Sequence, residues 1–310
     1  MHSSEFNPHS DIQSLEGKVF LITGGTAGLG SGAIEAFAEH NPSHIFFTGR
    51  NKKSADKLIS TVQSKFASVN LTFLECDQTS LASVREAANK FLAQSNRLDV
   101  LMCNAGVMGI DADQTKDGYE IQFGINHVAH ALLIKLLLPT MLETAKLPDA
   151  DVRIINMSSW GHKQAPSYGI QFETLKTSQA SLGGMIPGPR WSRYGQSKLA
   201  NLLYAQELAK RYPQITSVSV HPGFVMTGLY DNVNFLIRLP ALISSIGRTV
   251  PVDQGHYNQV WATTCRKSDI INGQYYEPVG VVGKDISKAA QDKQLAERLW
   301  DWTQEELAGY

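Results

Sequence analysis

The chain is poor in cysteine and carries no surplus of charge of either sign. Its three cysteines, Cys76, Cys103 and Cys265, are an odd number and lack the spacing of metal ligands, which argues against a disulfide framework and against a zinc site. The 28 basic residues nearly balance the 29 acidic ones, so the charge does not favour nucleic acid or an anionic membrane as a partner. We therefore expect free thiols in a reducing compartment and no bound metal.

Long hydrophobic runs are also scarce. Residues 1–16 are polar and lack the apolar centre of a signal peptide. Residues 131–142 are very apolar, but the run is short and contains Lys135 and Pro139, which favours a buried helix over a membrane span. These features predict a cytoplasmic protein without a membrane span, in which residues 1–16 form an N-terminal tail and residues 17–310 form one domain.

The first two thirds of the sequence alternate between short apolar runs and longer segments with helical periodicity. The apolar runs are dominated by Val, Ile, Leu and Phe, as expected for strands that are buried on both faces of a sheet. They are residues 18–23, 44–48, 71–76, 100–103, 153–157 and 217–220. Helical patterns such as residues 31–40 and 81–93 lie between them. This alternation predicts an α/β fold with a doubly wound parallel sheet, the Rossmann fold.

Two segments interrupt this rhythm. Residues 160–193 contain three prolines and two tryptophans, and residues 228–250 contain an apolar stretch soon after a predicted strand. In an open α/β sheet, loops beyond the carboxyl ends of the strands line the ligand crevice. We therefore expect both insertions to act as lids that shape a substrate pocket; the alternative is that they only decorate the surface.

The first predicted strand leads into a glycine-rich turn, Gly24-Gly25-Thr26-Ala27-Gly28-Leu29-Gly30, which opens a predicted helix. Glycines let the backbone approach a pyrophosphate, whose charge is stabilised at the helix N-terminus. The turn is not a P-loop, because Ser31 stands where that motif requires a lysine. A purely structural turn is the alternative. The predicted dinucleotide-binding residues of this turn are Gly24, Thr26, Gly28, Leu29 and Gly30.

No acidic residue follows the second predicted strand. An Asp or Glu there would accept hydrogen bonds from the ribose hydroxyls of NAD, but none occurs between residues 41 and 55. Arg50 and Lys53 stand there instead, and an arginine can grip a 2′-phosphate with two hydrogen bonds. The sequence therefore favours NADP(H) over NAD(H), with a solvated basic turn as the alternative.

Tyr194 is the only one of ten tyrosines that is followed four residues later by a lysine, Lys198. On a helix this spacing places both side chains on one face. Moving a tyrosine pKa from about 10 to neutrality requires roughly 4 kcal/mol. One cation at about 5 Å supplies about 3 kcal/mol at an effective dielectric of about 20. Lys198, together with an oxidised nicotinamide, could therefore activate Tyr194 for acid–base chemistry.

Taken together, the motifs resemble those of the short-chain dehydrogenase/reductase family, from about residue 18 to about residue 305. The motifs are Thr23-Gly24-x3-Gly28-x-Gly30, Asn104-Ala105-Gly106, Asn126, Ser159 and Tyr194-x3-Lys198. The stretches Asn126-His127-Val128-Ala129-His130, Ser197-Lys198-Leu199-Ala200-Asn201 and His221-Pro222-Gly223-Phe224-Val225 resemble the retinol-dehydrogenase-like branch.

The resemblance implies a catalytic group of four residues. Tyr194 would be the general acid in reduction, and Lys198 would lower its pKa and bind the nicotinamide ribose. Ser159 would hold the substrate oxygen, although Ser158 competes for this role. Asn126 would anchor a water that relays protons through Lys198; structural capping of a helix is the alternative.

The resemblance also implies further cofactor contacts. Asp77 would meet the adenine amino group, unless it caps the following helix. Asn104 would contact the adjoining ribose. The remaining cofactor residues implied are Ala105, Gly106, Pro222, Gly223, Val225 and Thr227. His127, His130 and His162 are expected to be packing or loop residues and not catalysts.

Two departures from the family pattern are visible. Cys103 stands where many members have a second asparagine before the Asn-Ala-Gly motif. The gap between Ser159 and Tyr194 is far longer than in short members, which leaves the shape of the pocket open. The family also implies a homodimer or homotetramer formed through the helices over residues 126–138 and 194–210, unless an insertion blocks that packing.

These features predict an NADPH-dependent enzyme that interconverts a carbonyl and an alcohol on a bulky, largely apolar substrate, such as a retinoid, steroid or polyketide-like compound. The aromatic and sulfur-containing residues expected to line its pocket are Trp160, Tyr168, Phe172, Met185, Trp191, Phe224 and Tyr230. A hydrolase is disfavoured, because Met157-Ser158-Ser159-Trp160-Gly161 lacks the first glycine of a nucleophile elbow. An NADP(H)-binding protein without redox turnover remains the alternative.

Overall fold

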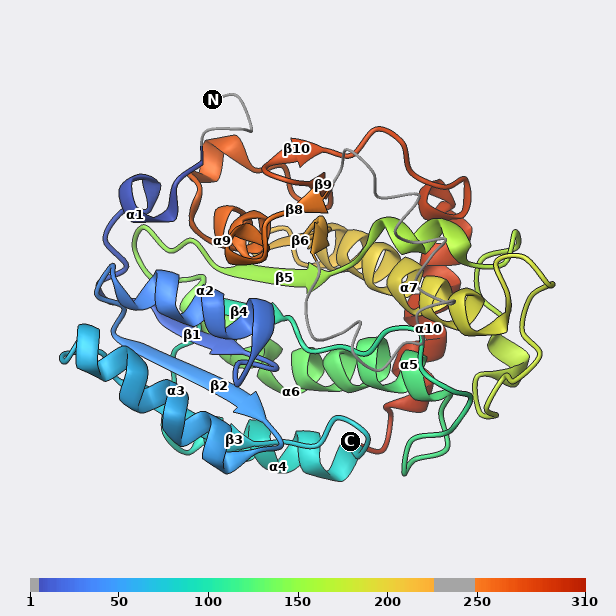
Figure 1. Ribbon diagram of the computed structural model, residues 1–310, viewed down its shortest axis with the longest axis horizontal. Helices are drawn as coiled ribbons and strands as arrows, with labels where there is room; N and C mark the ends of the chain where they lie inside the picture. The colour runs from blue at the N-terminus through green and yellow to red at the C-terminus, as the bar shows by residue number, and fades with distance from the viewer. Residues whose placement is uncertain (1–5, 226–248) are drawn as a thin grey trace.

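The computed structural model describes residues 6–225 and 249–310, and in these residues eight strands form one sheet (Figure 1). The strands are β1 (Val19–Ile22), β2 (His44–Gly49), β3 (Leu71–Glu75), β4 (Val100–Cys103), β5 (Arg153–Met157), β6 (Thr216–Val220), β9 (Tyr275–Glu277) and β10 (Val281–Val282). Their order is β10-β9-β6-β5-β4-β1-β2-β3, and only β10 runs antiparallel to its neighbour. The predicted doubly wound parallel sheet is confirmed.

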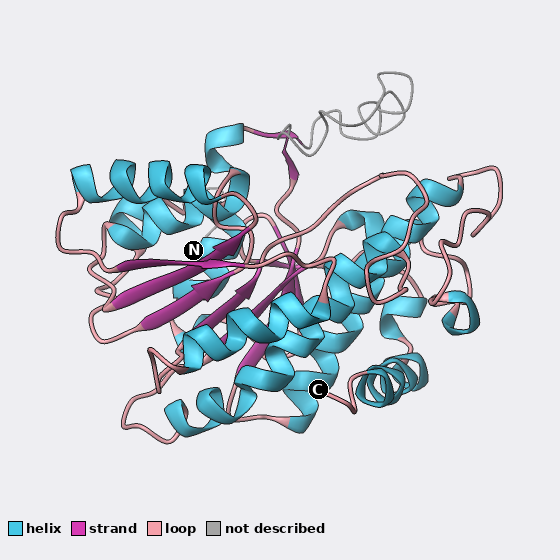
Figure 2. Cartoon of the chain, turned by 90° about the horizontal axis from the view of Figure 1, so that it is seen from below, coloured by secondary structure: helices cyan, strands magenta, loops and turns pink. Residues whose placement is uncertain are grey.

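Helices cover both faces of the sheet (Figure 2). Successive residues of β1 alternate between two hydrophobic clusters, with Val19 and Leu21 in one and Phe20 and Ile22 in the other. One cluster includes residues of α2 (Gly28–Ala38), α3 (Lys52–Lys65) and α9 (Tyr257–Thr264). The other includes residues of α4 (Leu81–Leu92), α6 (Ala129–Thr144), α7 (Pro189–Arg211) and α10 (Lys293–Glu306).

The predicted apolar helix is part of the core. α5 (Ile121–Phe123), the π-helical turn η1 (Gly124–Val128) and α6 form one continuous stretch. It is long and apolar enough to cross a membrane, but 83% of its most apolar window is buried inside the molecule. Burial of this kind is typical of a core helix, as the sequence predicted for residues 131–142.

The C-terminal helix α10 packs against α7, and it and the residue after it also contact η1 and α6. Trp300 stacks on Tyr204 of α7, with 5.1 Å between ring centroids. Nε2 of His127 lies 3.1 Å from Oγ1 of Thr303, and Lys135 of α6 donates to the carbonyl of Leu307. The helices through which the family resemblance implies oligomers are therefore covered by a segment of the same chain.

The predicted insertion at 160–193 is described in full, whereas the tail and the insertion at 228–250 are described in part. In the tail, α1 (Pro8–Asp11) is helical, and Ile12 and Leu15 are buried in the cluster with α9. Residues 160–188 form a loop with two short 3-10 turns, η2 (Trp160–Gln164) and η3 (Phe172–Thr174), and α7 already begins at residue 189. Most of the segment at 228–250 lies outside the described residues. Its last two residues form β8 (Thr249–Val250), which pairs with β7 (Phe224–Val225).

Candidate active site

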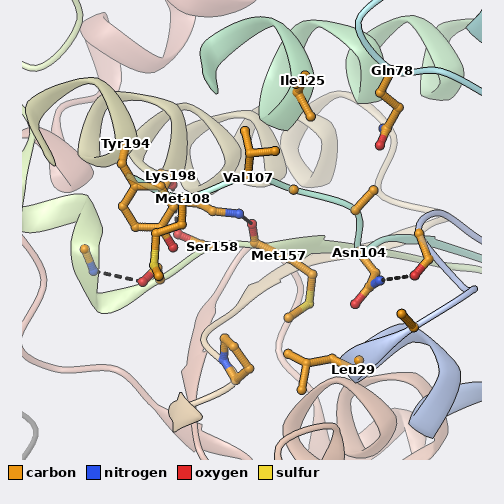
Figure 3. Close-up of a pocket in the computed structure, with 18 of the residues that line it drawn as sticks. Leu29, Gln78, Asn104, Val107, Met108, Ile125, Met157, Ser158, Tyr194 and Lys198 are labelled. Carbon is orange, nitrogen blue, oxygen red and sulfur yellow. Dashed lines mark hydrogen bonds between the residues drawn. The ribbon is translucent and has the colours of Figure 1, made fainter. Parts of the chain in front are cut away.

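A cleft of about 510 Å³ lies beyond the carboxyl ends of the parallel strands (Figure 3). The predicted site residues that line it are Gly24, Thr26, Gly28, Leu29, Arg50, Asp77, Asn104, Ala105, Gly106, Ser159, Tyr194, Lys198, Pro222 and Gly223. Gly30 and Asn126 are buried behind this lining. Val225 lies in β7, and Thr227 lies outside the described residues.

The glycine-rich turn between β1 and α2 forms an open anion cradle. A methyl group at Gly24, where φ is +66°, would lie 2.9 Å from Cα of Ala105. At Gly30 it would lie 2.4 Å from the carbonyl oxygen of Gly24, so both positions require glycine. The N-cap residue of α2 is Ala27, whose side chain cannot accept a hydrogen bond, and the first turn holds no acidic residue. The exposed N–H groups therefore fit the pyrophosphate of a dinucleotide.

Of the two predicted basic residues after β2, the structure places only Arg50 in the cleft. Arg50 directly follows the last residue of β2, and α3 begins two residues later. The side chain of Asn51 caps α3 by accepting from the amide of Ser54, at 3.1 Å. Lys53 is exposed on α3 and is absent from the lining of the cleft. Arg50 is thus the cation that borders the space beside the phosphate turn.

Asp77 lies in the lining after β3. It accepts a hydrogen bond from Nζ of Lys116 at 2.8 Å, and bonds from the amide and hydroxyl of Thr79. Burial alone would raise the pKa of Asp77, but the bonds from Lys116 and Thr79 outweigh it and lower the pKa. The side chain of Ser80, not Asp77, caps α4. The capping alternative for Asp77 is therefore wrong.

Asn104, which follows β4, bonds through its side chain to Thr23 after β1 and to Gln259 of α9. Its Nδ2 donates to the carbonyl of Thr23 at 2.8 Å, and its Oδ1 accepts from Nε2 of Gln259 at 3.2 Å. The same Gln259 amide lies 3.1 Å from the carbonyl of Leu29 in the phosphate turn. The side chain of Asn104 therefore holds the cradle together, while its backbone neighbours Ala105 and Gly106 border the cleft.

Two glycines bring the predicted serine and tyrosine together at the other end of the cleft. Oγ of Ser159 accepts from the amide of Gly161 at 3.0 Å and so caps η2. A methyl group at Gly161 would lie 2.7 Å from Cε1 of Tyr194 and 3.3 Å from Oγ of Ser159. A methyl group at Gly195 would lie 2.4 Å from the amide nitrogen of Ala165. Helix α7 and η2 can approach this closely only because both positions are glycine.

Lys198 lies beside Tyr194, as the spacing predicted. Its Nζ is 5.8 Å from the centroid of the Tyr194 ring and donates to the carbonyl of Met157 at 3.0 Å (Figure 3). Burial lowers the pKa of Lys198 to about 8, so the ammonium is still mostly protonated at neutral pH. The hydroxyl of Ser158 donates to the carbonyl of Lys198 at 2.8 Å. The Ser158 hydroxyl is thus bonded to the backbone of α7, whereas Oγ of Ser159 lies beside Gly161, next to the Tyr194 ring.

Asn126 connects three parts of the site from its place on the π turn η1. Its Oδ1 accepts from the amide of Val107 at 2.8 Å, and its Nδ2 donates to the carbonyl of Val107 and to Oγ of Ser197. The cap of α5 is Glu120, which accepts from the amide of Phe123, so the capping alternative for Asn126 is wrong. Single π turns in α-helices occur frequently at functional sites.

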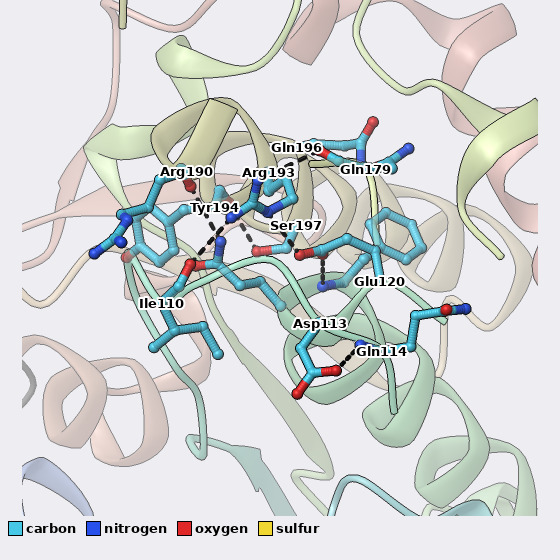
Figure 4. Close-up of polar contacts among 12 residues, drawn as sticks. Ile110, Asp113, Gln114, Glu120, Gln179, Arg190, Arg193, Tyr194, Gln196 and Ser197 are labelled. Carbon is cyan, nitrogen blue, oxygen red and sulfur yellow. Dashed lines mark hydrogen bonds and ion pairs between the residues drawn. The ribbon is translucent and has the colours of Figure 1, made fainter. Parts of the chain in front are cut away.

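The segment before Tyr194 is fixed by a buried ion pair (Figure 4). Nε of Arg193 lies 3.2 Å from Oε1 of Glu120, and both side chains are almost completely buried. The guanidinium also donates to the carbonyls of Gln179 and Ile110. Burial raises the pKa of Glu120, and the charge of Arg193 opposes that shift. The predicted insertion is thereby attached to α5 and to the start of α7.

Only part of the predicted apolar lining is observed. Trp160, Trp191 and Phe224 border the cleft near Tyr194, together with Met108, which the sequence reasoning missed. Tyr168 and Met185 are instead exposed, and Phe172 is buried in the core against Trp302. These three residues were predicted wrongly, because an insertion exposes some apolar residues and buries others in the core. Tyr230 lies outside the described residues.

Comparison with known proteins identifies the family. Residues 18–172 match the family model described as short chain dehydrogenase. The chain is 32% identical to short-chain dehydrogenase/reductase drtF of Aspergillus calidoustus over 96% of its length and 95% of that protein. The chain belongs to the short-chain dehydrogenase/reductase family. It is also 32% identical to short-chain dehydrogenase TIC 32 A, chloroplastic, of Brassica napus, covering 91% of this chain and 86% of that protein.

Solved structures share this fold. A protein from Mycobacterium paratuberculosis superposes with a TM-score of 0.73 at 24% identity, covering 97% of each chain. The NADPH-bound carbonyl reductase from chicken fatty liver gives a TM-score of 0.61 at 24% identity, covering 88% of this chain and 99% of that one. Short-chain dehydrogenases/reductases are oxidoreductases that use a nicotinamide cofactor. The cleft brings the glycine-rich turn and the Tyr194–Lys198 pair together in one lining.

Proposed function

We propose that this chain is an NADPH-dependent oxidoreductase that interconverts a ketone or aldehyde and its alcohol on a bulky, largely apolar substrate. One arrangement supports the proposal above the others. Tyr194, Ser159 and Lys198 meet at one end of a cleft whose other end holds an open helix N-terminus and Arg50. A protein that only bound the cofactor would not need the hydroxyls of Tyr194 and Ser159 and the buried ammonium of Lys198 at the end of the cleft away from the phosphate turn.

Each residue of the catalytic end has one role in this mechanism. The hydroxyls of Ser159 and Tyr194 orient the carbonyl oxygen and stabilise its developing charge, and Tyr194 then delivers a proton to it. The ammonium of Lys198 favours the phenolate that is left. Asn126 anchors a water that returns a proton through Lys198. The cofactor, when bound, supplies the hydride or accepts it.

The preference for NADPH rests on Arg50. Charge-assisted hydrogen bonds contribute roughly 1.5–3 kcal/mol, so replacing Arg50 by Ala should weaken NADPH binding by about 10- to 150-fold and leave NADH binding nearly unchanged. Lys57→Ala, an exposed lysine on the same helix as Lys53, is the matched control. Lys53→Ala should cause a smaller loss of affinity for NADPH, as expected for a more distant cation. If Arg50→Ala lowered the affinity for NADPH and for NADH equally, the role of Arg50 would be contradicted.

The substrate class is inferred from the apolar side chains beside Tyr194. Trp160, Trp191, Phe224 and Met108 offer ring faces and a thioether to a substrate such as a retinoid, steroid or polyketide-like ketone. The test is the oxidation of NADPH in the presence of ketones graded from small and polar to large and apolar, with Tyr194→Phe as the inactive control. Activity only on small polar sugars would contradict the proposed substrate class. NADPH binding without oxidation of the cofactor by any carbonyl would favour the alternative without redox turnover.

We further propose that residues 17–310 act as one domain in the cytoplasm, with residues 1–16 as an N-terminal extension. A fluorescent fusion of the full chain tests the location. Its accumulation in an organelle, as the name of the Brassica napus relative indicates for that protein, would contradict the cytoplasmic proposal.

A further inference from the structure

The imidazole of His130, on α6, contacts residues of three other segments: η1, the end of β1 and the loop after β3. His130 is on α6, one turn after Asn126, and only 2% of it is exposed. Its Nδ1 lies 2.9 Å from the carbonyl oxygen of Asn126. Its Nε2 lies 2.8 Å from Oγ1 of Thr23, at the end of β1, and 2.9 Å from Nε2 of Gln78, after β3. Both ring nitrogens are therefore in contact with residues that border the cleft or hold its lining.

The partners determine which ring nitrogen carries the proton. A carbonyl oxygen only accepts, so the proton of the neutral ring is on Nδ1 and is donated to Asn126. The single lone pair of Nε2 is then shared between the amide of Gln78 and the hydroxyl of Thr23, which lie 2.9 and 2.8 Å from it. The hydroxyl of Thr23 accepts from the amide of Ala105 at 2.9 Å, and its own proton is closer to Nε2 of His130, at 2.8 Å, than to the carbonyl of Met102, at 3.4 Å. Burial lowers the pKa of His130 to about 4, which is consistent with a neutral ring.

The Nε2 end of the ring belongs to the cofactor cradle. Thr23 accepts from the amide of Ala105 and, through its own carbonyl, from the side chain of Asn104. Gln78 lines the cleft next to Asp77. A group that fixes Thr23 and Gln78 therefore fixes the backbone that would face the adenine and ribose portions of the cofactor.

The Nδ1 end of the ring belongs to the catalytic end of the cleft. Asn126 donates through Nδ2 to Oγ of Ser197 at 2.9 Å, and Ser197 donates to the carbonyl of Tyr194 at 2.7 Å. The side-chain amide of Asn126 also accepts from the backbone N–H of Val107 and donates to the carbonyl of the same residue. A chain of short hydrogen bonds thus runs from His130 to the helical turn that carries the catalytic tyrosine.

We propose that His130 is a positioning residue that holds the cofactor cradle and the Asn126–Tyr194 turn at a fixed separation through the two nitrogens of one neutral imidazole. The inference rests on the proposed function for its catalytic half, whereas its cofactor half requires only that the chain binds NADPH.

Two conservative variants separate the two ends of the ring. His130→Asn places an amide N–H where Nδ1 stands, so it keeps the bond to Asn126 and loses the acceptor for Thr23 and Gln78. His130→Gln reaches the position of Nε2, so it keeps that acceptor and loses the donor to Asn126. One buried neutral hydrogen bond corresponds to roughly a 3- to 10-fold effect. His130→Asn should raise the Kd of NADPH by that factor, while His130→Gln should lower kcat at saturating NADPH by that factor.

His127 is the matched control, because it is equally buried on the same helical stretch. It contacts Thr303 of α10 instead of the cradle. His127→Gln should lower the Tm without changing the Kd of NADPH or kcat. The Kd is measured from NADPH fluorescence, which needs no turnover. If no carbonyl oxidises NADPH, the proposed function fails, but the His130→Asn effect on Kd still tests the cradle half of the inference.

Three results would overturn the proposal. The first is that both His130 variants change Kd and kcat in the same proportion. The second is that they lower only the Tm, as the His127 variant does. The third comes from the wild-type protein and does not depend on any variant folding: nitrogen-15 NMR of labelled histidine should show the Nδ1–H tautomer for the His130 ring, and an Nε2–H ring would contradict the assignment.

Discussion

Replacing Gly161 by Ala tests how strictly the catalytic residues are held. The added methyl group would lie 2.7 Å from Cε1 and 3.2 Å from Cδ1 of Tyr194. Carbon atoms pack at about 3.5–4.0 Å, so the tyrosine ring or η2 must move by roughly 1 Å. A displacement of about 1 Å in a reacting group costs about 100-fold in rate, or about 2.7 kcal/mol of activation free energy. We therefore expect kcat of Gly161→Ala to fall by about 100-fold.

The binding of NADPH should change little, because the phosphate turn and Arg50 lie at the other end of the cleft. Overpacking should also lower the free energy of unfolding by about 1–3 kcal/mol. Gly184→Ala is the control: it lies in the same insertion, and among the described residues no heavy atom other than those of its chain neighbours lies within 4 Å of the added methyl group. The assay compares kcat for NADPH oxidation, the Kd of NADPH and urea denaturation. A folded Gly161→Ala enzyme with kcat within about threefold of wild type would refute the reasoning.

Three further predictions concern charge, pH and assembly. Burial raises the pKa of Glu120 to about 7, so its carboxyl is charged only above that pH. At a pH of about 8.5, Glu120→Gln leaves the buried guanidinium of Arg193 without its counter-charge and should lower the free energy of unfolding by about 3 kcal/mol in urea denaturation; a loss below about 1 kcal/mol would contradict this. Because the pKa of Lys198 is lowered to about 8, its charge is present below that pH and lost above it. We expect kcat/KM for NADPH, which reports groups of the free enzyme, to fall as the pH rises through about 8, and a flat profile to pH 10 would exclude Lys198 as the titrating group. Because α10 covers α6 and α7, light scattering should show a monomer, and a dimer joined through those two helices would contradict the packing.

Much of the fold could be predicted because the central strands are buried on both faces. All six predicted strands occur, with no end shifted by more than one residue. The short strands β9 and β10 were missed, since two or three residues such as Val281 and Val282 carry no periodicity. Helix α2 begins at Gly28, three residues before the predicted start, because an uncapped glycine turn gives no conventional N-terminal signal.

The candidate site was predictable where a residue's role depends on a local motif. Gly24, Arg50, Tyr194 and Lys198 fall in this class. Gln259 and the carbonyl of Met157 were not predictable, because they reach the site only through the tertiary fold. Gly195 did carry a signal, since a glycine inside a helix costs about 1 kcal/mol relative to alanine and so indicates a close approach to another segment.

The bond from Gln259 to the phosphate turn has a consequence for how the chain acquires its function during synthesis. The turn lies near the N-terminus, but the amide that holds Leu29 and Asn104 is 230 residues from Leu29. Contacts of such high sequence separation form late, because a long loop must close before they contribute. A nascent chain that has completed β1 through β6 would therefore have its strands in order and still lack a finished cradle. We therefore expect a product truncated before Gln259 to bind the nicotinamide cofactor less tightly than the full chain does.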